Sequence, residues 1–130
     1  MLPMTKTLVP GDVRRFILTS VPSVPFLEAL LLLRAEARTE PLGLARRLYI
    51  AEFHALELLH ALQHSGIAAR DEQGLFRYEP GTDALRQLLN ELADTYAANL
   101  VDVTDLIHSR VDKRALQFAD AFRFKQKEAP

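Results

Sequence analysis

Three side chains between residues 52 and 65 combine the types and the spacing that metal sites use. Glu57, His60 and His64 follow one another at intervals of three and four residues, so a helix would carry one carboxylate and two imidazoles on one face. The set supplies only three ligands, and the sequence shows no neighbouring group that would orient the imidazoles. We therefore expect surface histidines, no metal site and no other cofactor. An alternative use of the three imidazoles of this segment, those of His54, His60 and His64, is to make binding sensitive to pH.

The residue pattern gives even less support to a catalytic site. The chain contains no Cys, which excludes thiol nucleophiles and thiolate zinc sites. It has no glycine-rich phosphate loop, and no motif joins a Ser and an Asp to a His as a triad. Asp102 and Asp105 are explained more simply as the polar face of a long helix. The sequence therefore predicts a protein that is not an enzyme.

The first half of the chain contains four helical segments separated by helix-breaking residues. Asp12 and Ser23 are the expected N-caps of the first two segments. The second segment is apolar nearly all round, so we expect it to be buried on most sides. The expected helices span Val13 to Ser20, Pro25 to Ala37, Leu42 to Tyr49, and Glu52 to Ser65, with Gly66 as the C-cap of the last.

The second half begins with a hairpin pattern and continues as a long helix. Two short extended runs, 67–70 and 75–79, flank a polar turn that contains Gly74. Thr82 or Asp83 then caps a helical pattern that runs without Gly or Pro to about Ser109. A helix of that length would span about 40 Å. A last helix, Lys113 to Phe124, precedes a charged tail.

This order of helix, short helix, turn, helix, glycine and hairpin resembles the winged helix-turn-helix plan. Residues 44–50 resemble the second helix of that motif, and residues 58–67 resemble its third helix and the entry to the wing. With one helix before and two after, the layout is similar to MarR-type and PadR-type bacterial transcription regulators. The resemblance implies a mainly α fold with a small β-hairpin wing, and a homodimer that binds double-stranded DNA with the third helix in the major groove.

The resemblance also implies a division of the chain into functional parts. Residues 1–11 would be a flexible N-terminal arm, and residues 12–80 the winged helix-turn-helix. Residues 81–124 would hold the dimerisation helices, because the long helix has an apolar stripe wide enough for its own domain and for a second copy. Residues 125–130 would be a tail.

The residue types on the expected DNA-reading helix fit DNA poorly. Its outer face carries Phe53, Glu57 and three histidines but no Lys or Arg, and Glu57 would meet a negatively charged groove. The DNA contacts that the resemblance implies are therefore phosphate contacts from arginines, with limited base reading from histidines. The residues concerned are Arg46, Arg47, Arg70 and Arg77 for phosphates, and His54, His60 and His64 for bases.

An alternative is that the winged helix has become a protein-interaction module that no longer binds DNA. Its partner would meet the face formed by Phe53, His54, Glu57 and His60, or the aromatic surface of the last helix around Phe118 and Phe122. The uncharged reading helix favours this alternative, and the formal net charge of −1 is lower than strong DNA binders usually carry.

Composition places the chain among ordinary intracellular domains. Its 130 residues suit one domain, and 48% hydrophobic and 25% charged residues are typical of a packed globular core. The longest apolar stretch, Phe26 to Leu33, is interrupted by Glu28 and is shorter than the ~20 residues of a membrane helix. We read no export signal at the N-terminus. We therefore expect a cytoplasmic protein with no membrane partner.

Overall fold

Helices and strands follow one another in the order that the sequence predicts, with one additional strand. The computed structural model describes residues 9–109. Its elements are α1 (Gly11–Ser20), α2 (Val24–Glu36), β1 (Arg38–Thr39), α3 (Pro41–Leu48), α4 (Glu52–His64), β2 (Ala68–Arg70), β3 (Phe76–Tyr78) and α5 (Asp83–Ala98). Residues 100–109 are also helical. Most of the expected N-terminal arm, the expected last helix with its Phe surface, and the tail lie outside the described residues.

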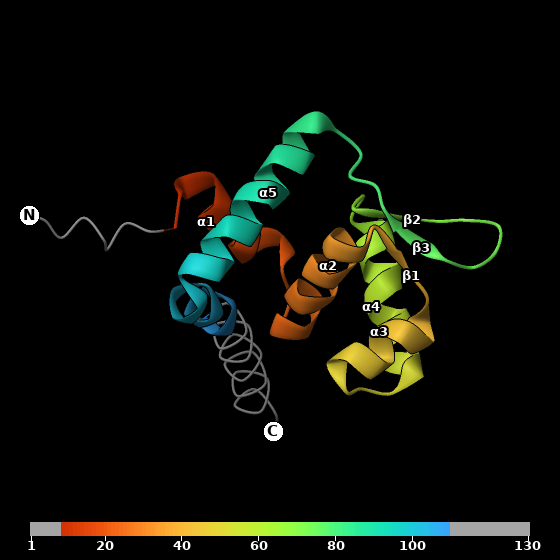
Figure 1. The fold of residues 1–130 in the computed structure, drawn as a ribbon. Coiled ribbons are helices and arrows are strands. Elements are labelled where there is room, and N and C mark those ends of the chain that lie inside the picture. The colour runs from red at the N-terminus through yellow and green to blue at the C-terminus, as the bar shows by residue number, and fades with distance from the viewer. Residues whose placement is uncertain (1–8, 110–130) are drawn as a thin grey trace, which may run out of the picture.

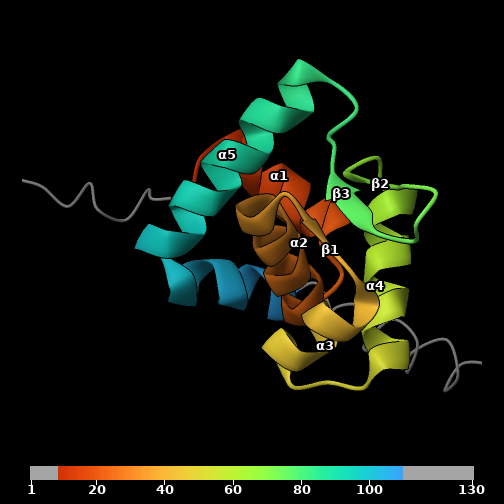
Figure 2. The ribbon, with the colours of Figure 1, turned by 45° about the vertical axis from the view of Figure 1, so that its right-hand side comes forward.

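Helix α2 lies at the centre of the fold, with α1 and α5 on one side of it and the α3–α4 pair on the other (Figure 1, Figure 2). It is buried at Phe26, Leu27, Ala29, Leu30 and Leu33, which confirms that its nearly uniform apolar composition marks a core helix. Among residues 9–109, no single helix is long and apolar enough to cross a membrane, and α1 and α2 reach that length and composition only as a pair bent by 116°.

Two of the three N-caps expected from the sequence are confirmed. The Ser23 hydroxyl accepts a hydrogen bond from the Phe26 N–H at 3.2 Å, and the Thr82 hydroxyl accepts one from the Leu85 N–H at 3.0 Å. The expectation that Asp12 is the N-cap of α1 is wrong, because the helix begins at Gly11, two residues before the expected start at Val13, and Pro10 occupies the N-cap position. Asp12 instead lies in the first turn, where its negative charge favours the positive end of the helix.

The wing is a three-stranded antiparallel sheet in the order β1-β3-β2, whereas the sequence predicts a two-stranded hairpin. The β2–β3 hairpin is confirmed, and β1 pairs with β3 so that Thr39 lies opposite Phe76 and Arg38 lies opposite Arg77. The chain leaves α2 through Ala37, whose φ of 68° turns it into β1 and whose carbonyl accepts from the Tyr78 N–H at 2.7 Å. A strand of two residues is too short to show a period-2 pattern in sequence.

Helix α4 ends in the glycine turn that the sequence predicts. Gly66 has a φ of +80°, and its N–H donates to the Gln63 carbonyl while the Ile67 N–H donates to the Leu62 carbonyl, both at 3.0 Å. This pair of bonds is a Schellman motif, which satisfies carbonyls at the end of the helix. Gly66 therefore sets the direction in which the chain leaves α4 and enters β2.

Replacing Gly66 with alanine should lower the free energy of unfolding by about 1–2 kcal/mol, because an L-residue in the left-handed region clashes with its own carbonyl. Denaturant unfolding of the full chain measures this loss. Gly11→Ala is the matched control, since Gly11 lies in α1 with nothing within 4 Å of an added Cβ. If the Gly66→Ala variant were as stable as Gly11→Ala, the left-handed turn at Gly66 would not contribute to the stability of the fold.

The expected uninterrupted helix from residue 82 or 83 to Ser109 is wrong, because the chain breaks at Asn99. Asn99 adopts φ −139° and ψ 55°, and its N–H still donates to the Thr95 carbonyl at 2.7 Å. Its own carbonyl then accepts from the Val103 N–H at 3.1 Å, which starts the next helical segment. The segment turns away from the axis of α5 (Figure 2) and buries Val103 and Ile107 completely. Burial of these two side chains offsets the interrupted helix.

Candidate nucleic-acid interface

Helices α3 and α4 form the helix-turn-helix. Leu44 and Ala45 of α3 and Ala55 and Leu59 of α4 are all buried in the same core. The turn between the helices begins at Tyr49, which is left-handed with a φ of 58°. Both the Tyr49 N–H and the Ile50 N–H donate to the Ala45 carbonyl. This local hydrogen bonding fixes where α4 begins relative to α3.

The outer face of α4 carries the side chains that the sequence places there. Phe53, His54, Glu57, His60 and His64 are exposed, while the apolar positions of the helix are buried. No group of three or more His, Asp or Glu side chains within residues 9–109 is arranged to hold a metal ion. Glu57, His60 and His64 share an exposed face of α4, and the structure does not bring their side chains together around one point.

His60 is engaged with the wing. Its ring packs edge-on against the ring of Phe76, with 5.6 Å between the centroids and 60° between the planes. The Arg70 guanidinium carbon lies 5.1 Å from the centre of the same Phe76 ring. Phe76 is fully buried, so it joins a side chain of α4 to one of β2. This contact holds the wing at a fixed position beside the candidate reading helix.

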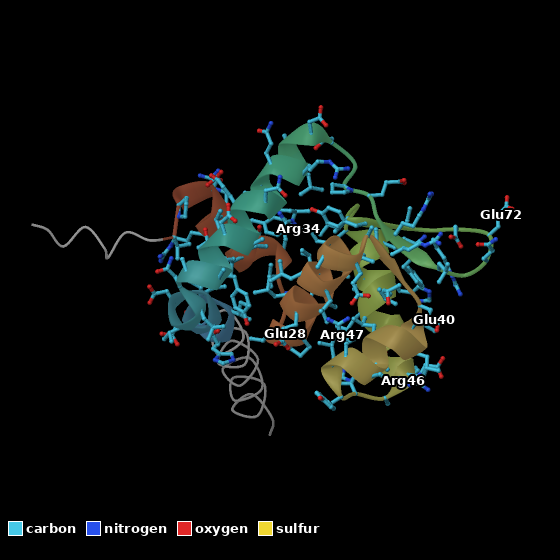
Figure 3. All side chains as sticks on the ribbon, in the orientation of Figure 1. Glu28, Arg34, Glu40, Arg46, Arg47 and Glu72 are labelled. Carbon is cyan, nitrogen blue, oxygen red and sulfur yellow. The ribbon has the colours of Figure 1, made fainter. Side chains whose placement is uncertain are left out.

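The tip of the wing is acidic, but its two carboxylates have different roles. One Asp71 oxygen accepts from the Gln73 N–H at 2.9 Å and from the Leu75 N–H at 3.0 Å. Gly74, with a φ of +86°, completes this turn. Asp71 thus stabilises the conformation of the loop, while Glu72 projects from the tip (Figure 3). Glu72 is the wing residue that would weaken contact with phosphates.

The four predicted phosphate-binding arginines lie on α3 and on the wing. Arg46 and Arg47 are both exposed on α3 (Figure 3), and Arg47 forms an ion pair with Glu36 at the end of α2. On the wing, Arg77 lies 3.7 Å from a Glu79 oxygen. Within residues 9–109, Arg46 and Arg70 form no ion pair with a carboxylate. Exposed pairs contribute about 0–1 kcal/mol, so a phosphate can replace either carboxylate at little cost.

Arg38 is a candidate contact that the sequence reasoning did not assign. It lies directly opposite Arg77 in the β1–β3 pair, and both residues are exposed. Like charges at facing positions of an antiparallel pair destabilise the sheet, and an anion on this face would relieve their repulsion. The place of Arg38 beside Arg77 was not predicted, because β1 itself was missed.

A second polar cluster joins the wing to α5. The Nε and Nη2 atoms of Arg34 donate to the Asn90 side-chain oxygen at 3.1 and 2.9 Å, and the Arg86 guanidinium carbon lies 5.7 Å from the centre of the Tyr78 ring. Burial raises the pKa of the Tyr78 phenol, and the positive charges of Arg34 and Arg86 oppose this shift. These contacts attach α5 to α2 and to β3.

A pocket between α1 and α5 contains two carboxylates. The pocket, of about 390 Å³, is lined by Asp12, Ala84, Gln87, Leu88 and Glu91. A hydrogen bond with Asp12 raises the pKa of the Glu91 carboxyl. The two carboxylates would repel a phosphate at this pocket. The exposed arginines of α3 and of the wing, on either side of α4, make that surface the candidate nucleic-acid interface.

Comparison with known proteins finds the likeness in structure alone. No protein-family model matches the sequence, and no curated protein matches it either. The reduced form of MarR from E. coli superposes with a TM-score of 0.51 at 14% identity, covering 100% of this chain and 96% of that one. A MarR family transcriptional regulator from Streptomyces coelicolor gives 0.52 at 18% identity, covering 90% and 88%.

A third solved structure, the transcriptional regulator Tm0710 from Thermotoga maritima, gives a TM-score of 0.52 at 12% identity and covers 97% of this chain and 93% of that one. Each superposition extends over nearly the whole of both chains, so the likeness includes the helices on either side of the wing motif. The chain therefore has the winged helix-turn-helix fold found in MarR-family transcription regulators.

Proposed function

We propose that this protein is a transcriptional regulator that binds double-stranded DNA through α3, α4 and the wing, and that it is not an enzyme. The observation that carries the proposal is the arrangement around Phe76. That ring fixes the wing against α4, so that a helix of groove-fitting size and a sheet that carries exposed arginines are held together as one rigid unit. Such a regulator would act where the chromosome is, in the cytoplasm of a bacterial cell.

Within this surface, the arginines would provide affinity through phosphate contacts, and α4 would place the protein against the base edges. Arg46 on α3 and Arg70, Arg77 and Arg38 on the sheet would each contact a phosphate, with Arg47 exchanging its Glu36 partner for the same role. His54 and His64, which are exposed on α4, would offer limited contacts to bases. His60 would act through the wing, because its ring is held at Phe76.

Binding to a random-sequence duplex at several salt concentrations tests this proposal. If these five arginines each neutralise one phosphate, the slope of log affinity against log salt is about −4.5 per subunit, so raising salt from about 50 to 200 mM lowers affinity roughly 500-fold. A flat salt dependence, or no binding even at the lowest salt, would contradict the proposal.

We also propose that two copies of the chain form a homodimer. Leu100 and Val101 are 54% and 66% exposed on the segment that follows the break at Asn99. Their apolar side chains are therefore left uncovered in a single copy of the chain. A second copy would cover them and would present two reading helices to successive turns of the groove. Light scattering that gives 14.7 kDa at all concentrations would contradict the dimer.

A protein-interaction module is the second candidate function. The observation that favours it is the exposure of Tyr49 and Phe53, at 95% and 71%, beside a helix without Lys or Arg. Exposed aromatic side chains are typical of protein interfaces. Failure to bind any duplex at low salt would support this candidate and exclude the first.

A further inference from the structure

Two aromatic side chains stand out at the helix-turn-helix. Tyr49 and Phe53 are the most exposed large hydrophobic side chains among residues 9–109, although the same region buries Leu44, Leu58, Leu59 and Leu62. They lie four positions apart, at the end of α3 and in the first turn of α4. Exposure of this size needs a reason, because a domain that could bury these rings would gain stability by doing so.

The backbone holds both rings at the same end of the reading helix. Tyr49 is left-handed, which is uncommon for a bulky residue and costs free energy that glycine would save. Its N–H and that of Ile50 are nevertheless tied to the Ala45 carbonyl. In helix-turn-helix proteins the N-terminal residues of the reading helix are those that meet the base edges. Phe53 occupies that place in α4.

The chemistry of the major groove offers one partner for such rings. Base edges there present hydrogen-bond donors and acceptors, together with a single apolar group, the C5-methyl of thymine. Phe53 has no polar atom to offer, and α4 has no Lys or Arg for the O6 and N7 acceptors of guanine. Glu57, one turn after Phe53 on the same exposed face, would repel those acceptors. The surface is therefore unfavourable to guanine and favourable to thymine.

We propose that Phe53 and Tyr49 select thymine-containing sites by packing against C5-methyl groups in the major groove. The inference rests on the proposed function and adds the class of sequence that the protein prefers. Arg46 lies one turn before Tyr49, exposed and without a carboxylate partner among the described residues. It supplies the positive charge for the phosphate beside those bases.

Removal of the methyl group alone tests the proposal. Duplexes that bind the full-length protein are first selected from a random pool, and thymine should be enriched at adjacent positions. Each enriched thymine is then replaced by deoxyuridine, which keeps the base pairing and lacks the methyl. Affinity should fall by about three- to fivefold per methyl group removed.

The double variant Tyr49→Ala, Phe53→Ala should abolish the preference for thymine over deoxyuridine while leaving the salt dependence unchanged. Gln87→Ala is the control, since Gln87 is exposed on α5, outside the proposed DNA-contacting surface, and it should keep the preference. Salt-dependent binding without any difference between thymine and deoxyuridine would overturn this inference and leave the proposed function standing. Absence of binding to any duplex would overturn both.

Discussion

Replacing Phe76 with alanine should lower the free energy of unfolding by about 3–5 kcal/mol. The ring is fully buried at the point where the wing, α4 and β1 meet, and it lies opposite Thr39 in β1 and Arg70 in β2. Its removal leaves a cavity and also takes away the contacts with His60 and Arg70. A loss of this size is a large fraction of the stability of an ordinary domain.

Urea unfolding followed by circular dichroism measures the effect, with Phe53→Ala as the matched control. Phe53 is the same residue type on the same motif but is 71% exposed, so its removal should change stability by no more than about 0.5 kcal/mol. Equal stability of the two variants would mean that Phe76 does not join the wing to the rest of the fold.

The double variant Arg46→Gln, Arg77→Gln should weaken binding to every duplex by about 10- to 100-fold near 0.1 M salt. Each lost phosphate contact reduces the salt slope by about 0.9, so two reduce it by about 1.8. The two residues come from different elements, α3 and β3, so the variant tests whether both belong to one DNA-contacting surface. Fluorescence anisotropy against a labelled random duplex measures the affinity and the slope together.

A second double variant separates local contacts from total charge. Arg14 and Arg15 are exposed on α1, on the side of the fold that carries α5, and Arg14→Gln, Arg15→Gln changes the net charge by the same amount. This control should bind with nearly the affinity of the unaltered protein. Equal losses in the two double variants would show that binding follows net charge and not the surface of α3, α4 and the wing.

The helical core of the fold was predictable because its signals are local and strong. Helix α4 shows apolar residues at helical spacing and ends at a glycine with the required positive φ. Helix α2 combines a capping serine with an apolar run too short for a membrane. The hairpin follows from two short runs around a turn with Gly74. Each of these features depends on neighbours in sequence, which a pattern can show.

The features that were missed depend on tertiary contacts. Strand β1 has two residues and exists because β3 pairs with it, so the nearness of Arg38 to Arg77 could not be read from the chain. Asn99, where α5 ends, has weak helix propensity, but propensity alone does not end a helix. The chain turns there because the next segment then buries Val103 and Ile107. Phe53 was expected on the outer face of α4, but the unusual backbone and full exposure of Tyr49 were not.

The central claim is that α3, α4 and the wing form the surface that holds DNA. Amide chemical-shift mapping of the full-length protein, titrated with a random duplex at low salt, tests it most directly. We expect shifts concentrated in residues 38–64 and 68–78, with the exposed face of α1 and α5 unchanged. Shifts concentrated on α1 and α5, or no shifts at a saturating excess of duplex, would contradict it.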